Sequence, residues 1–290
     1  MRFDMNIETL ARFRDMKIET AHGITGYREA GASHPRTLPV VLLHGIGSGA
    51  ASWVRQLETL GQTRRVFAWD APGYGASTRV ASASPLAIDY ANALSAWLDA
   101  IGVDRCVLVG HSLGAIVAGS FAASASERVA GLLLISPAAG YGAASKDVRE
   151  SKRDARLKML AELGPQGLSR ERSANMLSQY ADDEAREWVR WNMARIVPEG
   201  YAQATHLLAN ADLASDLARF HGRTAVAVGA EDAITPPEAC AFIAQAANVS
   251  LQVMPHAGHA GYVESPAAYT ALIDAFCQSI ECRMKDGATQ

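Results

Sequence analysis

The sequence repeats one pattern, a short and continuous apolar run that ends near Gly, Asp or Pro and is followed by a helix-length segment. Strands of a parallel sheet are buried on both faces by helices, so they read as continuous rather than alternating apolar runs. We therefore predict an α/β fold with a mostly parallel central sheet flanked by helices. The runs are LPVVLLHG (38–45), RRVFAWDAPG (64–73), RCVLVGHS (105–112), VAGLLLISP (129–137), RTAVAVGAED (223–232) and SLQVMPHAGH (250–259).

The repeat has an antiparallel beginning and one interruption. The stretch MKIETAHGITGYREAG (16–31) predicts a hairpin at one edge of the sheet. Between about residues 140 and 215 the sequence is helical and amphipathic, which predicts an inserted cap over the carboxyl ends of the strands. The core domain would then comprise residues 1–139 and 216–290. Charges from Lys146 to Lys158 alternate in sign, a pattern typical of a solvated helix face.

The charge balance and length limit the classes of partner. The 290 residues contain 27 Lys and Arg against 30 Asp and Glu, a net charge of −3, so no overall basic field points to nucleic acid or an anionic membrane. Charged residues interrupt the amino-terminal stretch, which therefore does not resemble a signal peptide, and no apolar stretch approaches the roughly 18 residues of a membrane helix. A small-molecule substrate is the expected partner, and the oligomeric state is not predicted.

The four cysteines predict reduced thiols rather than a metal site or a disulfide framework. Cys106, Cys240, Cys277 and Cys282 have neither the close paired spacing of zinc ligands nor the density of a small secreted domain. We expect a cytoplasmic protein. The sequence predicts no metal and no cofactor.

The pentapeptide Gly110-His111-Ser112-Leu113-Gly114 lies between a predicted strand and a predicted helix. In a G-x-S-x-G turn the glycines let strand and helix approach, while the serine takes a strained conformation that exposes its hydroxyl. The pattern alone is common. Its context makes Ser112 a candidate nucleophile.

A serine hydroxyl needs a base to take its proton, and that base needs an acid to orient it. The later strand ends offer both. VGAEDAITPP (228–237) supplies Glu231 and Asp232, and PHAGHAGYVESP (255–266) supplies His256 and His259. The chain order is serine, acid, histidine.

With these motifs the chain resembles the α/β-hydrolase family from about residue 24 to 280. The resemblance implies Asp232 as the acid, because family members carry it three residues after the glycine that ends its strand. It implies His259 as the base, because this residue matches the family's Gly-His pair. Glu231 and His256 stay open as alternatives.

The resemblance also implies an oxyanion hole made of backbone N–H groups. One belongs to Leu113, directly after the nucleophile, and the other to Ile46 after the family's His-Gly pair, with Gly47 as the neighbour that could replace it. His44 is then a structural residue of this loop.

The stretch DAPGYGAS (70–77) resembles the family's Asp-x-x-Gly-x-Gly-x-Ser turn. We assign it a structural role. Gly73 and Gly75 would take positive φ, and Asp70 would accept hydrogen bonds from loop amides.

Together these residues predict a serine hydrolase that cleaves a small carboxylic ester or lactone through an acyl-enzyme. Haloalkane dehalogenases and epoxide hydrolases of the superfamily use aspartate as nucleophile and are disfavoured. Hydrolases that cleave C–C bonds of ring-fission products usually have asparagine before the serine and tryptophan after the histidine, where this chain has His111 and Ala260. That activity and a cofactor-free haloperoxidase or perhydrolase activity remain alternatives.

Two hypotheses come from other classes of protein. Gly45 to Ala50 match G-x-G-x-x-A after a strand, and Asp70 stands where a ribose-binding acid would, which would make a dinucleotide site. A hydrolase fold can also be reused as a non-catalytic binding module. The first hypothesis leaves Ser112, Asp232 and His259 unexplained, and the second normally involves a lost triad residue.

The cap supplies candidate pocket residues. The sequence favours an inner helix stripe for the two tryptophans and a solvated surface for the two arginines. The alternative is that aromatic and sulfur-containing side chains cover an apolar pocket and that the arginines bind a substrate carboxylate. The apolar candidates are Trp188, Trp191 and Met193, with Tyr201 further along, and the arginines are Arg190 and Arg195.

Overall fold

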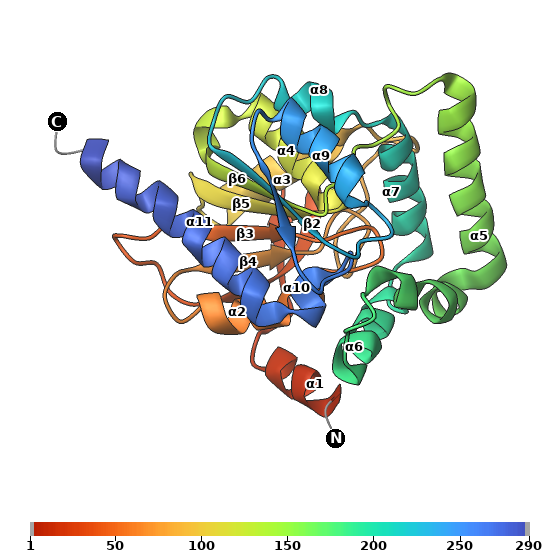
Figure 1. Ribbon diagram of the computed structural model, residues 1–290, viewed down its shortest axis with the longest axis horizontal. Helices are drawn as coiled ribbons and strands as arrows, with labels where there is room; N and C mark the ends of the chain where they lie inside the picture. The colour runs from red at the N-terminus through yellow and green to blue at the C-terminus, as the bar shows by residue number, and fades with distance from the viewer. Residues whose placement is uncertain (1–2, 288–290) are drawn as a thin grey trace.

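The computed structural model describes residues 3–287, and a twisted eight-stranded sheet forms its centre (Figure 1). The strand order is β1-β2-β4-β3-β5-β6-β7-β8. The first two strands form an antiparallel hairpin, β2 pairs antiparallel with β4, and all later pairs are parallel, as predicted. The strands are β1 (Met16–Thr20), β2 (Gly23–Ala30), β3 (Val40–Leu43), β4 (Val66–Trp69), β5 (Cys106–His111), β6 (Val129–Ile135), β7 (Thr224–Gly229) and β8 (Leu251–Met254).

Helices cover both faces of the sheet (Figure 1). The α-helices of the described chain are α1 (Phe3–Ala11), α2 (Val54–Leu60), α3 (Ala87–Ala100), α4 (Leu113–Ser124), α5 (Lys146–Arg172), α6 (Asp183–Met193), α7 (Pro198–Asn210), α8 (Leu213–Leu217), α9 (Pro237–Ala246), α10 (Gly261–Glu264) and α11 (Pro266–Gly287). Short 3-10 helices are η1 (Ala50–Trp53), η2 (Ser126–Arg128) and η3 (Ser173–Met176).

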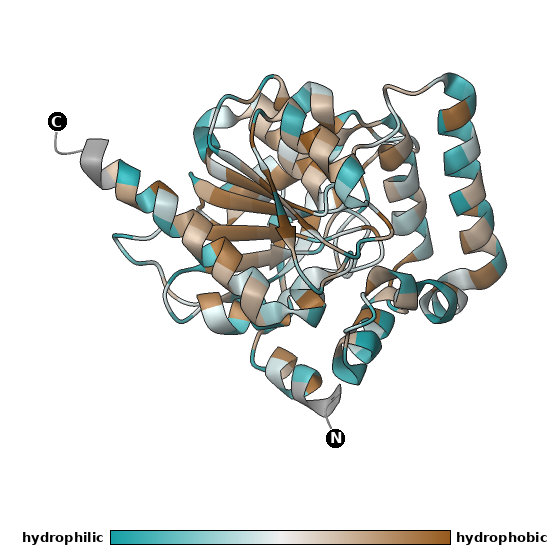
Figure 2. Cartoon of the chain, viewed as in Figure 1, coloured by the Kyte–Doolittle hydropathy of each residue, from teal (hydrophilic) through white to brown (hydrophobic). Residues whose placement is uncertain are grey.

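Alternation along the strands divides the core into two layers. In β3, Val41 and Leu43 pack with α3, α4, α8 and α9, whereas Val40 and Leu42 pack with α2 and α11. All four side chains are fully buried. Figure 2 shows the strands as the most hydrophobic part of the molecule. Burial on both faces explains the continuous apolar runs in the sequence.

Helices α5 to α8 lie between β6 and β7, within the stretch where the sequence predicts no strand. We refer to residues 140–215 as the cap. Helices α5 and α7 pack side by side beyond the carboxyl ends of the parallel strands (Figure 1). Helix α5 is broken at Gly164, whose φ is 58°, and Pro165 starts its last segment.

Helix α1 was not predicted. It packs on α2 and α6, where Leu10 joins Val54 and Trp188 in a small apolar cluster. Cys106, Cys240 and Cys277 are buried free thiols, and Cys282 is an exposed free thiol.

Candidate active site

Ser112 occupies a sharp turn between β5 and α4. Its φ of 53° and ψ of −115° are rare for a residue with a side chain, so the surrounding structure must hold this strained backbone in place. The Ser112 N–H donates to the carbonyl oxygen of Ile135, and the Ser112 carbonyl accepts from Ala115 and Ala138. The side chain lines a cavity and is 6% exposed.

The two glycines of the motif permit this turn. A Cβ on Gly110 would lie 2.5 Å from the carbonyl oxygen of Gly114, and a Cβ on Gly114 would lie 2.4 Å from that of Leu43. Both distances are too short for any larger residue. The predicted close approach of strand and helix is therefore present.

His259 and Asp232 form a buried pair at the carboxyl ends of the last two strands. Nδ1 of His259 lies 2.9 Å from Oδ2 and 3.1 Å from Oδ1 of Asp232. The side chains are 1% and 0% exposed. Because a carboxylate only accepts, Nδ1 carries the proton, and Nε2 is the ring nitrogen that can accept one.

The environment of Asp232 keeps it ionised. Burial alone would raise the pKa of this carboxyl group, but the hydrogen bond and charge of His259, together with two backbone N–H groups, lower the pKa to about 2. The N–H groups are those of Ile234 and Thr235, both 2.8 Å from Oδ1. The Thr235 hydroxyl lies 2.9 Å from Oδ2, a contact the sequence analysis missed.

The alternative acid and base lie elsewhere. Glu231 accepts from the backbone N–H of Gln179 in the cap. His256 is exposed, with its ring edge against Tyr180 at a centroid distance of 4.5 Å.

His111 connects the turn that carries Ser112 (residues 110–114) to the loop that carries His259 (residues 255–260), which we call the histidine loop. Its Nε2 lies 2.9 Å from the backbone carbonyl oxygen of His259, and the two rings are 4.8 Å apart. Burial and the charge of His259 lower the pKa of His111 to about 3. The ring is therefore neutral and adds no positive charge beside His259.

The loop after β3 brings Ile46 and Gly47 to the same cavity as Leu113. The N–H of Leu113 is in the first turn of α4, where backbone donors lack intrahelical acceptors. Tyr74 fixes the loop by donating its hydroxyl to the Ile46 carbonyl oxygen at 2.8 Å.

His44 has the structural role expected of it. Its Nδ1–H donates to the Gly45 carbonyl oxygen at 2.8 Å, and its Nε2 accepts from the Ala71 N–H at 3.0 Å. Burial lowers the pKa of the ring. With both nitrogens occupied, His44 has no free position for proton transfer.

Asp70 is also used internally. Its Oδ1 accepts from the Ala50 N–H at 2.8 Å, and burial raises its pKa. A Cβ on Gly75 would lie 2.3 Å from Oδ2, and Gly73 and Gly75 take positive φ as predicted. This carboxylate closes the turn, so it is not exposed to bind a ribose, and the dinucleotide hypothesis loses its acid.

Ser112 and His259 share one cavity of about 510 Å³ between the strand ends and the cap. Ile46, Gly47 and Leu113 also line it, together with Met193 of the predicted cap residues. Tyr201 lines it as well. Its other walls include Ala138, Met159, Leu168, Met176, Val189, Leu208, Ile234 and Tyr262.

The remaining cap candidates, Trp188, Trp191, Arg190 and Arg195, do not line this cavity, so their positions correspond to the helix stripe and the surface arginines rather than to pocket residues. Helix α6 turns Trp188 toward α1 and α2, and Trp191 stacks on it at 4.7 Å. The Arg195 guanidinium covers the Trp191 ring at 4.3 Å. Arg190 pairs with Glu187 one helical turn away, with half of its side chain exposed.

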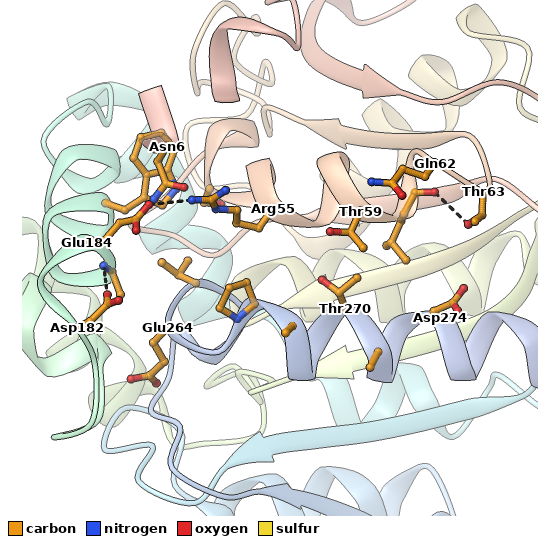
Figure 3. A pocket seen from close by; sticks show the side chains of 18 residues that line it. Asn6, Arg55, Thr59, Gln62, Thr63, Asp182, Glu184, Glu264, Thr270 and Asp274 are labelled. Carbon is orange, nitrogen blue, oxygen red and sulfur yellow. Dashed lines mark hydrogen bonds and ion pairs between the residues drawn. The ribbon is translucent and has the colours of Figure 1, made fainter. Parts of the chain in front are cut away.

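A second cavity of about 600 Å³ lies between α2, α6 and α11 and contains none of the proposed triad (Figure 3). Figure 3 shows Arg55 reaching toward Glu184, with a nitrogen–oxygen distance of 2.9 Å. Ser52 and Val263 line both cavities. Within the part of the chain described here, no cluster of three or more His, Cys, Asp or Glu side chains could hold a metal ion.

Comparison with known proteins places the chain in a family. The model of the alpha/beta hydrolase family matches residues 40–272. The chain belongs to the alpha/beta hydrolase family.

Three relatives describe the range of the similarity. RutD of Variovorax paradoxus, which bears the name of a carbamate hydrolase, is 32% identical over 246 residues, or 81% of this chain and 90% of RutD. A malate-bound thermophilic esterase from Thermogutta terrifontis is 27% identical with a TM-score of 0.80, covering 92% of this chain and 99% of that one. The enol-lactonase of Burkholderia xenovorans LB400 is 22% identical with a TM-score of 0.79, covering 90% and 99% respectively, which shows the shared fold.

Other curated relatives match only locally. The chain spans 23% and 30% of the length of the first two of them. Within residues 3–287, none of the hydrolase's helices is both long and apolar enough to cross a bilayer.

Proposed function

We propose that this hydrolase cleaves a small carboxylic ester or lactone through an acyl-enzyme formed on Ser112. The observation that supports this most directly is the buried His259–Asp232 pair, 2.9 Å apart, whose histidine lines the same cavity as the strained Ser112. In such a pair the histidine carries its proton on Nδ1, which faces the aspartate, and Nε2 is free to accept the serine proton, as serine acylation requires.

In this mechanism His259 Nε2 takes the Ser112 hydroxyl proton while Oγ attacks the substrate carbonyl carbon. The N–H groups of Leu113 and Ile46 then hold the oxyanion, each contributing on the order of 3 kcal/mol to the lowering of the barrier. Collapse of the intermediate breaks the bond to the leaving oxygen, which receives the proton from His259.

Water completes the cycle. It loses a proton to His259, attacks the acyl-enzyme carbonyl, and releases the carboxylic acid and the Ser112 hydroxyl. Among the described residues no hydrogen bond joins Ser112 to His259. Nucleophile–base contacts of this kind are often loose until a substrate is bound.

A substrate panel tests the proposal. A p-nitrophenyl ester, an enol-lactone, a carbamate and a vinylogous 1,5-diketone would be compared in the wild type and in Ser112→Ala. Ser124→Ala is the matched control, because Ser124 lies on α4 and its hydroxyl donates only within that helix. The carbamate is included because the relative RutD is named as a carbamate hydrolase.

We expect turnover of the ester or the lactone, retention in Ser124→Ala and loss in Ser112→Ala. Mass spectrometry should detect the acyl group on the peptide that contains Ser112. Substantial ester hydrolysis by Ser112→Ala would refute the nucleophile. Turnover of the diketone alone would replace the proposal with C–C cleavage, and turnover of the carbamate alone with carbamate hydrolysis.

A further inference from the structure

One wall of the Ser112 cavity is cationic. Lys152, Arg156 and Arg172 line it, and no Asp or Glu is among the described residues that do. The whole chain has a net charge of −3, so this concentration of positive charge is not a property of the average surface. A cleft lined by charges of one sign raises the local concentration of oppositely charged small molecules.

Arg156 is the best-placed of the three cations. It is half-buried, whereas Lys152 and Arg172 are exposed. Its Nη1–H donates to the Tyr201 hydroxyl oxygen at 3.2 Å, and Tyr201 is 6% exposed. This bond occupies one of five guanidinium donors, and because Tyr201 accepts it, the phenolic hydrogen is left to donate elsewhere.

The other cations nearby on α5 already have acceptors. Arg149 donates to the Ala209 carbonyl and the Asn210 side chain, Arg153 pairs with Asp154 at 2.7 Å, and Lys158 pairs with Glu162 at 3.8 Å. Arg156 forms no ion pair within the described chain. The alternating charges therefore predict a solvated face correctly for Lys158, which is exposed, but not for Arg156, which lines the cavity.

The neighbouring cavity has the opposite charge. Four carboxylates line it, those of Asp182, Glu184, Glu264 and Asp274, against the single cation Arg55 (Figure 3). Ser52 and Val263 line both cavities, so two adjoining cavities differ in the charge of the side chains that line them.

We infer that the substrate carries a carboxylate away from its scissile bond, and that Arg156 and Tyr201 bind this group. The inference rests on the proposed ester or lactone hydrolysis and specifies its substrate class. Arg156 offers parallel N–H donors that match a carboxylate, and the Tyr201 hydroxyl adds a further donor. Lys152 and Arg172 attract the anion from their exposed positions.

The rest of the cavity fits a hydrocarbon spacer between the two ends. Met159 lies one turn after Arg156 on α5, and Ala138, Leu208 and Met193 complete an apolar wall. A cavity of about 510 Å³ is in the lower half of the range for small-molecule sites. A monoester of a short dicarboxylic acid, or a lactone with a carboxylate side chain, has the matching chemistry.

The test uses paired substrates that differ only in charge. Mono-p-nitrophenyl esters of succinic, glutaric and adipic acid would each be compared with the corresponding ester whose second carboxyl is a methyl ester. We expect the wild type to have a kcat/KM at least about tenfold higher for one anionic member than for its neutral pair, with the preferred length reporting the spacing between Ser112 and Arg156.

Arg156→Gln removes the charge and should lower kcat/KM for the anionic ester on the order of 10- to 100-fold, the effect of losing hydrogen bonds to a charged group. The neutral ester should change less than about threefold. Arg153→Gln is the matched control, because Arg153 lies on the same helix outside the cavity lining. It should retain the wild-type preference.

Tyr201→Phe deletes a single hydroxyl group and keeps the test decisive if Arg156→Gln does not fold. It should reduce the preference for the anionic over the neutral ester several-fold. Neutral esters hydrolysed as fast as anionic ones, with Ser112→Ala inactive, would overturn this inference and leave the proposed function standing. Failure to hydrolyse any ester or lactone, charged or neutral, would overturn both.

Discussion

The Nε2–H of His111 donates to the backbone carbonyl oxygen of His259, 2.9 Å away, so the residue before the candidate nucleophile holds the backbone of the candidate base. The opposite nitrogen, Nδ1, is buried without a partner. Protonating Nδ1 would place a buried positive charge where none of the described residues accepts a hydrogen bond from it. The arrangement requires a neutral ring.

His111 should therefore destabilise the fold in acid. Below about pH 6.5 the unfolded chain takes up a proton at this histidine, while the folded chain does not until its pKa of about 3. Because the unfolded state binds more protons in this window, the free energy of unfolding decreases as the pH is lowered. The full loss, roughly 5 kcal/mol, is reached near pH 3.

The measurement is urea denaturation of the wild type and His111→Gln at pH 6.5 and 4.5. The glutamine amide can replace the donated bond and does not titrate. We expect the variant to lose about 2 to 3 kcal/mol less of its free energy of unfolding between these pH values. His22→Gln, at an exposed position, should behave like the wild type. Equal losses in His111→Gln and the wild type would contradict the expectation.

Asp232→Asn should lower kcat on the order of 10³- to 10⁴-fold with little change in KM. The amide NH₂ would face either His259 Nδ1–H or the N–H groups of Ile234 and Thr235, all of which are donors. In the first orientation His259 would be held in the wrong tautomer, and in the second the amide would oppose two backbone donors. Glu231→Gln is the control, and a larger loss in that variant would reassign the acid.

The sequence was most informative where function depends on local spacing. The turn from Gly110 to Gly114 is a five-residue pattern, so Ser112 and its glycines could be recognised without knowing any tertiary contact. The strand ends limit the acid to Glu231 or Asp232 and the base to His256 or His259, because the carboxyl ends of parallel strands meet at one edge of a sheet. Only the family resemblance favours Asp232 and His259 within these pairs.

The cap could not be predicted in the same way. Periodicity gives α6 an apolar stripe but does not say which neighbour covers it, and α1, which covers Trp188, was not itself predicted. Met193 faces the cavity from another side of the same helix. Arg156 was missed because an alternating charge pattern looks the same whether one of its members is solvated or turned inward.

Glu264 connects the cap to the histidine loop, and Glu264→Gln should loosen both. One of its oxygens accepts the N–H of Gly258, next to His259, and the other accepts the N–H and hydroxyl of Ser178, each at 2.9 Å. An amide nitrogen in either position would face a donor. We expect a loss of about 1 to 3 kcal/mol in stability and a several-fold fall in kcat.

Thermal denaturation and ester kinetics measure both effects. The exposed Glu238 offers a control of the same chemistry, and Glu238→Gln should change neither quantity. Unaltered kcat in Glu264→Gln with lowered stability would restrict Glu264 to a structural role.

Gly114 and Gly119 on α4 provide a comparison between two crowded glycines. A Cβ on Gly114 would meet the backbone oxygen of Leu43 at 2.4 Å, which cannot move without shifting the strand that leads to Ile46. A Cβ on Gly119 would meet the tip of the Leu213 side chain at 2.3 Å, which can rotate away. Gly114→Ala should cost about 3 kcal/mol or more and Gly119→Ala less than half of that.

Activity should separate the two variants further. Displacing the strand end before Ile46 moves its N–H relative to that of Leu113, so Gly114→Ala should lose most of its kcat even at temperatures where it remains folded. Gly119→Ala should keep the wild-type value. Measuring kcat for one neutral ester alongside urea denaturation of both variants tests this, and comparable kcat in the two would mean that the distance between these amides does not limit catalysis.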